Sequence, residues 1–194
     1  MYRQFTSLFF LFGIGIACCR AQQINTPKHF QFHSINSVSL LEGQVGASFQ
    51  LQTINGAQYK SWFAGAGIGL DYYRIRTIPF FIDLRKEFGK SRSKFFVFAD
   101  GGIDFSWATD KEKIPYTAND KFSNGFYRSA GGGYKIAVNR NNSLLMDIGY
   151  SLKNSKETYR PPVLNYYGPE ALWEPQQQVN YNLSRVIIKI GWEF

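Results

Sequence analysis

The last eleven residues of the chain, 184–194, read SRVIIKIGWEF, and their pattern decides the fold class. Alternate positions in this stretch are apolar: Val186, Ile188, Ile190, Trp192 and Phe194. The positions between them include three charged residues: Arg185, Lys189 and Glu193. Successive side chains of a strand point to opposite faces, so the stretch predicts a strand with one apolar and one charged face.

The same alternation recurs from about Phe30 onward. Eight segments, each bounded by glycine, asparagine, proline or charged residues, predict strands near 30–42, 47–55, 58–72, 78–88, 94–107, 124–138, 142–153 and 180–194. The composition agrees, because 18 Phe, 12 Tyr and 4 Trp with 19% charged residues exclude a disordered chain and favour strands. After the first twenty residues no apolar run reaches the roughly 18 residues that a membrane helix needs. We therefore predict an all-β chain.

The connections between these segments sort by length to the two ends of the predicted sheet. On the side of the N-terminus they are Asn55-Gly56, 89–93 and 139–141, which are short and rich in turn-forming residues. The two long connections, 108–123 and 154–179, fall on the other side. Short turns at one end and long loops at the other are typical of an outer-membrane barrel. The pattern predicts an eight-stranded antiparallel up-and-down transmembrane β-barrel.

One face of the predicted strands carries charges of both signs. Its members are Asp71, Asp83, Arg85, Glu87, Asp100, Asp104, Lys135, Asp147, Lys153, Arg185, Lys189 and Glu193. This face suits the narrow lumen of an eight-stranded barrel, where opposite charges can pair. It is too charged for the ligand cavity of a soluble lipocalin-like barrel, which is the competing interpretation. The other face has aromatic residues near both strand ends, as the girdles at two membrane interfaces require.

Residues 1–21 have the organisation of a secretory signal peptide. Arg3 supplies the positive charge, Leu8–Ala17 the apolar region and Cys19-Arg20-Ala21 the small-residue cleavage site. We expect a single mature domain, 22–194, with 20 basic and 14 acidic residues and a net charge of +6. This charge is spread along the chain, so no nucleic-acid partner is expected. A second interpretation, in which Cys18 is lipidated, stays open.

No motif predicts enzyme chemistry or a cofactor. The alternating glycines of residues 65–69 lack the G-x-G-x-x-G spacing of a phosphate-binding loop. His29 and His33 are the two histidines, and residues 22–194 contain no cysteine, so no zinc site is expected. His33 could share a strand face with Ser37 or Ser39, but no acid is evident to orient it. We expect a non-enzymatic protein, with a lipid- or lipopolysaccharide-modifying enzyme or a small-solute channel as alternatives.

The long connection 154–179 is rich in proline and aromatic residues. Its aromatic side chains include Tyr159, Tyr166, Tyr167 and Trp173. Such side chains on an exposed loop suit a binding surface for an extracellular or periplasmic partner. A cap folded over the barrel mouth is the alternative, and the partner itself cannot be named from the residues.

Three segments resemble the small eight-stranded bacterial outer-membrane β-barrel family. They are SRVIIKIGWEF at 184–194, TINGAQYKSWFAGAGIGLDYY at 53–73 and IPFFIDLRKEF at 78–88. The first ends in Phe194 and resembles the C-terminal assembly signal that the barrel-insertion machinery reads. The resemblance covers essentially all of residues 22–194 and implies a location in the outer membrane, in contact with lipid and lipopolysaccharide. It implies no particular activity.

Overall fold

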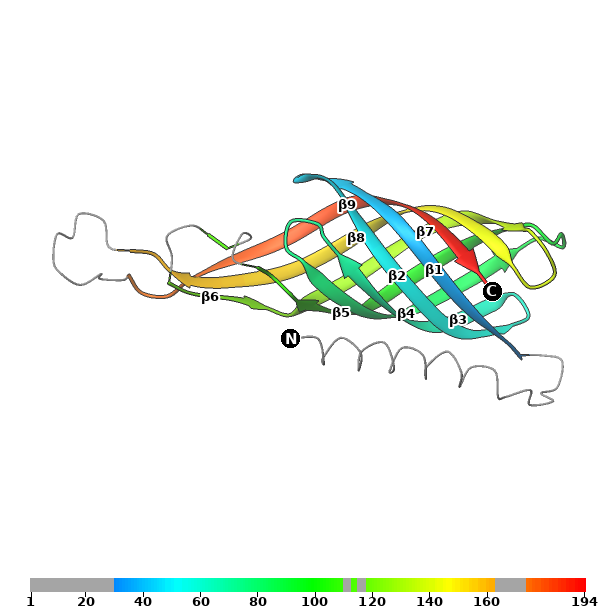
Figure 1. Ribbon diagram of the computed structural model, residues 1–194, viewed down its shortest axis with the longest axis horizontal. Coiled ribbons are helices and arrows are strands. Elements are labelled where there is room, and N and C mark those ends of the chain that lie inside the picture. The colour runs from blue at the N-terminus through cyan, green and yellow to red at the C-terminus, as the bar shows by residue number, and fades with distance from the viewer. Residues whose placement is uncertain (1–29, 110–112, 115–117, 163–173) are drawn as a thin grey trace, which may run out of the picture. The chain divides into compact units, whose positions relative to one another are not determined.

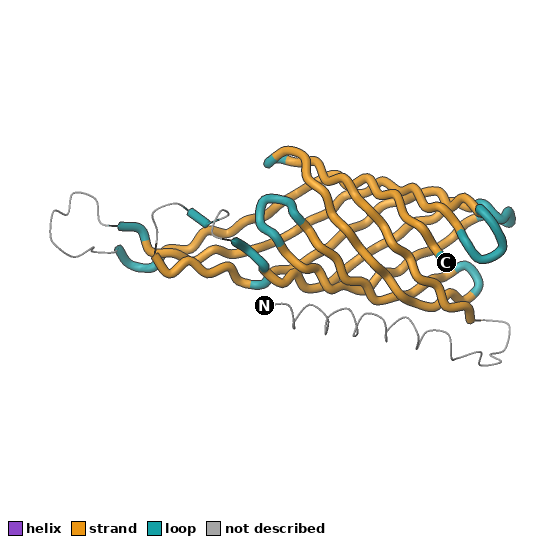
Figure 2. Tube along the Cα trace, viewed as in Figure 1, coloured by secondary structure: helices purple, strands orange, loops and turns teal. Residues whose placement is uncertain are grey.

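The computed structural model describes residues 30–109, 113–114, 118–162 and 174–194. Nine strands lie in these ranges: β1 (Phe30–Gly43), β2 (Gly46–Tyr59), β3 (Trp62–Asp71), β4 (Thr77–Phe88), β5 (Lys94–Ser106), β6 (Ala118–Ser123), β7 (Gly125–Ala137), β8 (Ser143–Arg160) and β9 (Gln177–Glu193). Within these ranges, no helix is long and apolar enough to cross a membrane. Figure 2 shows that strands joined by short connections make up the described chain.

The strands form one closed antiparallel sheet. Its order is β6-β8-β7-β5-β4-β3-β2-β1-β9, and a further pairing of β8 with β9 closes the ring. β6 and β7 are separated only by Asn124 and both pair with β8, so they are two parts of one barrel strand. The barrel therefore has eight strands, which confirms the predicted fold class (Figure 1).

The predicted turn at Asn55-Gly56 is wrong. β2 continues through both residues, and the chain instead turns at Lys60 and Ser61, where Lys60 has a φ of 56°. Gly56 is needed inside the strand, because a Cβ there would lie 2.3 Å from the carbonyl oxygen of Ala64 on β3. An asparagine-glycine pair read as a turn former thus marks a close approach of two strands.

Both predicted long loops are partly strand. β6 lies within the predicted loop 108–123, and β8 and β9 extend into the predicted loop 154–179, paired as far as Tyr159 and Gln177. These extensions lie beyond the apolar belt, where both faces are polar and the alternation that signals a strand is lost. The extended hairpin and β6 lie at one end of the barrel, and the C-terminus lies at the other (Figure 1). We call these the loop side and the turn side.

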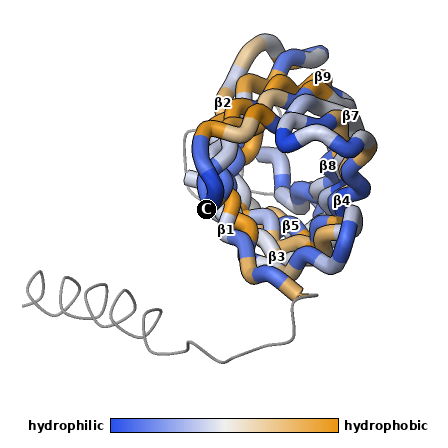
Figure 3. Tube along the Cα trace, turned by 90° about the vertical axis from the view of Figure 1, so that its right-hand side faces the viewer, coloured by the Kyte–Doolittle hydropathy of each residue, from blue (hydrophilic) through white to orange (hydrophobic). Residues whose placement is uncertain are grey.

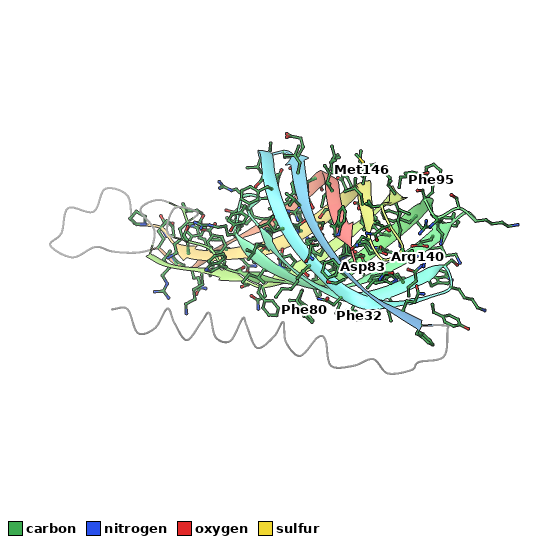
Figure 4. The ribbon with its side chains drawn as sticks, turned by 45° about the vertical axis from the view of Figure 1, so that its right-hand side comes forward. Phe32, Phe80, Asp83, Phe95, Arg140 and Met146 are labelled. Atoms are coloured by element: carbon green, nitrogen blue, oxygen red, sulfur yellow. The ribbon has the colours of Figure 1, made fainter. Side chains whose placement is uncertain are left out.

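The barrel turns most of its large apolar residues outward. Phe80, Phe95 and Met146 point away from the barrel, whereas Asp83 points inside (Figure 4). Ile82, the next outward-facing residue of β4 after Phe80, is 67% exposed. The outward face is continuous over neighbouring strands, and a surface of this size and apolarity is suited to contact with lipid.

Aromatic rings fill much of the lumen, which the prediction of a charge-filled interior missed. The buried apolar cluster is Ile35, Ile54, Phe63, Phe81, Phe96, Phe98, Tyr127 and Leu145. Phe98 lies against the backbone of Gly131 and Gly149, where a Cβ would come within 2.9 and 3.0 Å of its ring. Phe81 covers Gly67 in the same way, at 2.5 Å. Inward glycines therefore make the room that the rings occupy. Figure 3 looks toward the turn-side end of the ring of strands.

Candidate functional site

The structure buries all twelve predicted lumenal charged residues, none of which is more than 9% exposed as a whole residue. They gather in three groups along the barrel. The loop-side layer holds Asp71, Asp104, Lys153 and Arg185; the central layer holds Asp83, Arg85, Asp100, Asp147 and Lys189; the turn-side layer holds Glu87, Lys135 and Glu193. Each layer combines residues from several strands, so each ties the barrel wall together across the lumen.

The loop-side layer is electrically balanced. Arg185 Nη2 lies 2.6 Å from Asp71 Oδ2, and Lys153 Nζ lies 3.6 Å from Asp71 Oδ1 and 3.9 Å from Asp104 Oδ2. Lys153 also donates a hydrogen bond of 2.6 Å to the carbonyl of Ile75. Two cations and two carboxylates thus neutralise one another away from water, as buried charges must.

The connection between β3 and β4 lies against this layer, since Lys153 Nζ contacts the carbonyls of both Tyr73 and Ile75. Tyr73 and Ile75 are each 1% exposed and lie inside the barrel mouth. The Tyr73 hydroxyl accepts a hydrogen bond of 3.0 Å from the amide of Val45, and the Arg185 guanidinium lies 5.2 Å from the Tyr73 ring centroid. The odd-numbered positions from 71 to 77 stay buried even though β3 has ended at Asp71.

The central layer contains three carboxylates and two cations. Arg85 makes a bidentate contact with Asp83, with Nε–Oδ1 and Nη2–Oδ2 distances of 2.9 and 3.0 Å. Lys189 Nζ lies 3.2 Å from Asp100 Oδ2. Asp83 is the cross-strand partner of Asp100, and Asp147 is that of Lys189. The two cations are therefore held between carboxylates of three different strands, β4, β5 and β8.

Aromatic rings separate and support the cations of this layer. Lys189 Nζ lies 4.0 Å from the Phe98 ring centroid, and the Arg85 guanidinium lies 5.4 Å from Phe96 and 5.8 Å from Phe98. Contacts of this kind attract a cation to the face of a ring, more strongly when water is excluded. The lumen is thus a packed alternation of rings and ion pairs.

The turn-side layer is centred on Lys135. Its ammonium lies 2.9 Å from Glu87 Oε1 and also bonds Glu193. Lys94 Nζ lies 2.8 Å from Glu87 Oε2, and His33 Nδ1 lies 3.2 Å from Glu193 Oε1. The sequence-based set omitted Lys94, although it occupies the same inward positions of β5 as Phe96 and Phe98.

No hydrolytic pair forms around His33. Both nitrogens of its ring lack a hydrogen bond to any hydroxyl, and the hydroxyls of Ser37 and Ser39 have no hydrogen-bond partner. The imidazole instead faces Glu193 in the turn-side layer. In the part of the chain that the structure describes, no cluster of histidine, cysteine or carboxylate side chains could hold a metal ion.

The five residues of the predicted assembly signal are exposed on the outer face of the barrel: Val186, Ile188, Ile190, Trp192 and Phe194. The same segment also closes the ring. The amide of Phe194 donates to the carbonyl of Ser34 at 3.0 Å, and the amide of Ser34 donates back to the carbonyl of Phe194 at 2.8 Å.

The predicted loop surface is only partly described. Tyr159 belongs to β8 and not to a loop; it is half-buried, and its hydroxyl donates to Gln177 Oε1 at 3.3 Å. Its assignment to a loop is therefore wrong, because the β8–β9 hairpin extends farther than predicted. Tyr166, Tyr167 and Trp173 lie outside the described residues.

A polar cavity opens at the turn side of the lumen. Its volume is about 360 Å³, and its inner wall includes Glu87, Lys135 and Glu193. The next space inward, between Phe63 and Phe96, has a volume of about 10 Å³. A space of this size holds at most about one water molecule, so the lumen is narrow there.

No protein-family model matches the chain, and no curated protein sequence matches it. Its fold is similar to that of the outer membrane protein OprG from Pseudomonas aeruginosa, with a TM-score of 0.56, 12% identity and coverage of 86% of this chain and 96% of that one. It is also similar to the structure of the outer membrane protein AlkL in DMPC lipid bilayers, with a TM-score of 0.50 and 9% identity. That match covers 90% of this chain and 93% of AlkL. The chain therefore has the fold of the small eight-stranded outer-membrane β-barrels, as the sequence resemblance implied.

Proposed function

We propose that this protein spans the bacterial outer membrane as a non-enzymatic barrel with a closed lumen, and that it acts structurally or by binding partners at its loop side. The observation that carries the proposal is the division of its residues between two faces. Charged side chains are buried and paired, whereas apolar side chains such as Ile82 and Ile148 stay exposed. Removing apolar surface from water stabilises a protein by about 25 cal/mol per Å². This outward surface would forgo that stabilisation in water, whereas lipid would cover it in a bilayer.

Aromatic side chains at the two ends of the apolar belt support a membrane-spanning position. On the turn side Phe30, Phe88, Phe95, Trp192 and Phe194 are exposed, and on the loop side Phe80, Trp107, Phe126 and Tyr150 are exposed. Two aromatic girdles mark the two interfaces of a bilayer in membrane barrels. This favours a transmembrane barrel over a soluble carrier.

The packed lumen supports a structural role over a small-solute channel. A hydrated solute would have to displace the rings and ion pairs of three layers, and the constriction beside Phe63 and Phe96 has room for about one water molecule. The absence of a hydrogen-bonded Ser–His pair around His33 supports a non-enzymatic protein over a lipid-modifying hydrolase.

Cations above the apolar belt support contact with lipopolysaccharide. Lys121, Lys156 and Arg160 are exposed on the outward face of the β6–β8 extension, beyond Leu152, the last exposed large apolar residue of β8. A polar groove of about 440 Å³ includes Lys121 and Arg160. Basic side chains just outside the hydrocarbon region are placed to meet phosphate groups of the outer leaflet.

Two measurements on the refolded protein test the proposal. In phosphatidylcholine liposomes the folded barrel is expected to migrate faster on a denaturing gel before boiling than after it. In a planar bilayer it is expected to pass no ion current, and a Phe63→Ala/Phe96→Ala variant is also expected to pass none, because the central and loop-side layers still fill the lumen. A protein that stays soluble without detergent contradicts the membrane location, and steady conductance by the unaltered protein contradicts the closed lumen.

Hydrolysis is tested separately with purified outer-membrane lipid. We expect no release of fatty acid by the barrel and the same result for a His33→Ala variant. Release that disappears in the variant would establish the enzymatic alternative.

A further inference from the structure

The turn-side cavity carries more positive charge than its own carboxylates can neutralise. Its five cations are Lys90, Arg92, Lys94, Lys135 and Arg140, and its two carboxylates are Glu87 and Glu193. Together they leave a net charge of +3 around a space of about 360 Å³. We call this space the turn-side cup. Its other lining residues are polar or small, and several carry amide groups that can donate or accept hydrogen bonds.

The two carboxylates of the cup are already engaged. Glu87 lies between Lys94 and Lys135, and Glu193 lies between Lys135 and His33. The surplus charge therefore belongs to the rim.

The rim cations are Lys90, Arg92 and Arg140, which are exposed. Within the described part of the chain, none of the three lies within 4 Å of a carboxylate oxygen. An unpaired guanidinium presents a planar set of donors that matches the two oxygens of a carboxylate or phosphate.

The two turns that carry the rim cations are held in place and joined. In the β7–β8 turn, Asn139 Oδ1 accepts hydrogen bonds from the amides of Asn141 and Asn142 at 2.9 and 2.8 Å, which fixes the turn around Arg140. The Ala137 amide donates to the hydroxyl of Ser93, at the end of the β4–β5 turn, at 3.2 Å. Arg92 and Arg140 thus project from connected supports, and a ligand between them would meet cations already brought together.

We infer that the turn-side cup binds a small polar molecule bearing a carboxylate or phosphate group. The oxyanion lies between Arg92 and Arg140 at the rim, and the polar remainder faces the amides and paired carboxylates of the floor. The lining residues of the strands, such as His33 and Lys135, occupy inward positions, so the ligand enters from the aqueous space at the turn side and not from the lipid face. The cup volume lies within the range of small-molecule sites, about 300–1,000 Å³. This inference goes beyond the proposed structural role and does not depend on the lumen being closed to ions.

The experiment uses the refolded barrel in nanodiscs of phosphatidylcholine, which has no net charge. Inorganic phosphate and succinate are titrated separately while amide chemical shifts are followed. For at least one of the two probes we expect saturable shifts confined to residues 89–94 and 137–143.

Two double variants that lose the same net charge separate a site from general electrostatic attraction. Arg92→Gln/Arg140→Gln is expected to weaken binding at least tenfold, and Lys156→Gln/Arg160→Gln, at the loop side, is expected to leave it unchanged. The altered residues are exposed, and the gel shift on boiling confirms that each variant folds. Equal losses in both variants, or shifts that never saturate, would overturn the inference.

A lipid headgroup could supply the same phosphate chemistry, and a second arm distinguishes this source. The barrel is placed in nanodiscs containing phosphatidylglycerol with no soluble oxyanion present. We expect the amides of 89–94 and 137–143 to keep their shifts. If the anionic lipid moves them while phosphate and succinate do not, the turn side is a headgroup contact and the cup is not a site for a soluble ligand.

Discussion

Replacing Lys189 by methionine tests whether the ion pairs of the lumen hold the barrel together. The Lys189 side chain is 2% exposed, and its ammonium lies 3.2 Å from Asp100 and 4.0 Å from the Phe98 ring centroid. Methionine is similar in length and can keep the contact with Phe98. The substitution therefore removes the charge and leaves most of the packing intact.

The loss is expected to be large because the remaining charges cannot rearrange. Arg85 is already held by the bidentate contact with Asp83, so the carboxylate of Asp100 would stay buried without a cation. Breaking a buried ion pair by removing one partner costs about 3–5 kcal/mol of unfolding free energy. Adding Asp100→Asn removes the carboxylate that has lost its cation. The unfolding free energy lost in the double variant is therefore expected to be smaller, by at least about 1 kcal/mol, than the sum of the losses in the two single variants.

Urea unfolding in phosphatidylcholine liposomes measures these differences, with the faster-migrating unboiled gel band reporting the folded fraction. The four proteins of the cycle are the unaltered chain, the two single variants and the double variant. A Lys189→Met variant within about 0.5 kcal/mol of the unaltered protein, or single losses that simply add, would refute a stabilising role for the central layer, because contacting groups couple by about 0.5–3 kcal/mol.

Three further predictions follow from the outer face, the glycines and the last residue. Ile188→Arg places a charge on the lipid face and is expected to lower the urea unfolding free energy by about 2–4 kcal/mol; a neutral result would mean that the faces are assigned backwards. Gly131→Ala puts a Cβ 2.3 Å from the carbonyl oxygen of Ile148 and is expected to lower the unfolding free energy by about 1–3 kcal/mol in the same assay. Gly101→Ala is the control and is expected to be neutral, because its Cβ would have no atom within 4 Å. Equal effects of the two substitutions would contradict the packing described for Gly131. Phe194→Ala is expected to cost no more than about 1–3 kcal/mol in the refolded barrel but to reduce insertion sharply in cells, measured as folded protein in the outer-membrane fraction; normal insertion would contradict the resemblance to the assembly signal.

The alternation of apolar and charged residues was sufficient to predict the fold and the direction of most side chains. It works well at the end of β9, where outward Ile188, Ile190 and Trp192 alternate with inward Lys189 and Glu193, although Ile187 is apolar and inward. It failed for Phe81, Phe96 and Phe98, which are apolar yet inward. Their positions depend on glycines of neighbouring strands, and a single strand's pattern carries no information about which strand will lie beside it.

Turn positions and strand ends were harder to predict for different physical reasons. Asn55-Gly56 has the composition of a turn, but its glycine serves a close contact between β2 and β3. Near the end of β8 both faces of the hairpin carry polar side chains. The residues from Asn154 to Arg160 therefore show no alternation of apolar and polar types. The pairing of Lys94 with Glu87 depends on the register of β4 against β5, which the residues alone do not specify.

The most direct test of the central claim is to measure what surrounds the outward face. A single cysteine is placed at Ile188 or at Lys156 in residues 22–194, which contain no other cysteine, and carries a nitroxide label in phosphatidylcholine liposomes. Power saturation then compares collisions with oxygen, which dissolves in lipid, and with a water-soluble nickel complex. We predict that the label at 188 is reached by oxygen and not by nickel, and that the label at 156 shows the reverse. A label at 188 that nickel reaches as readily as the one at 156 would contradict a lipid-facing apolar surface.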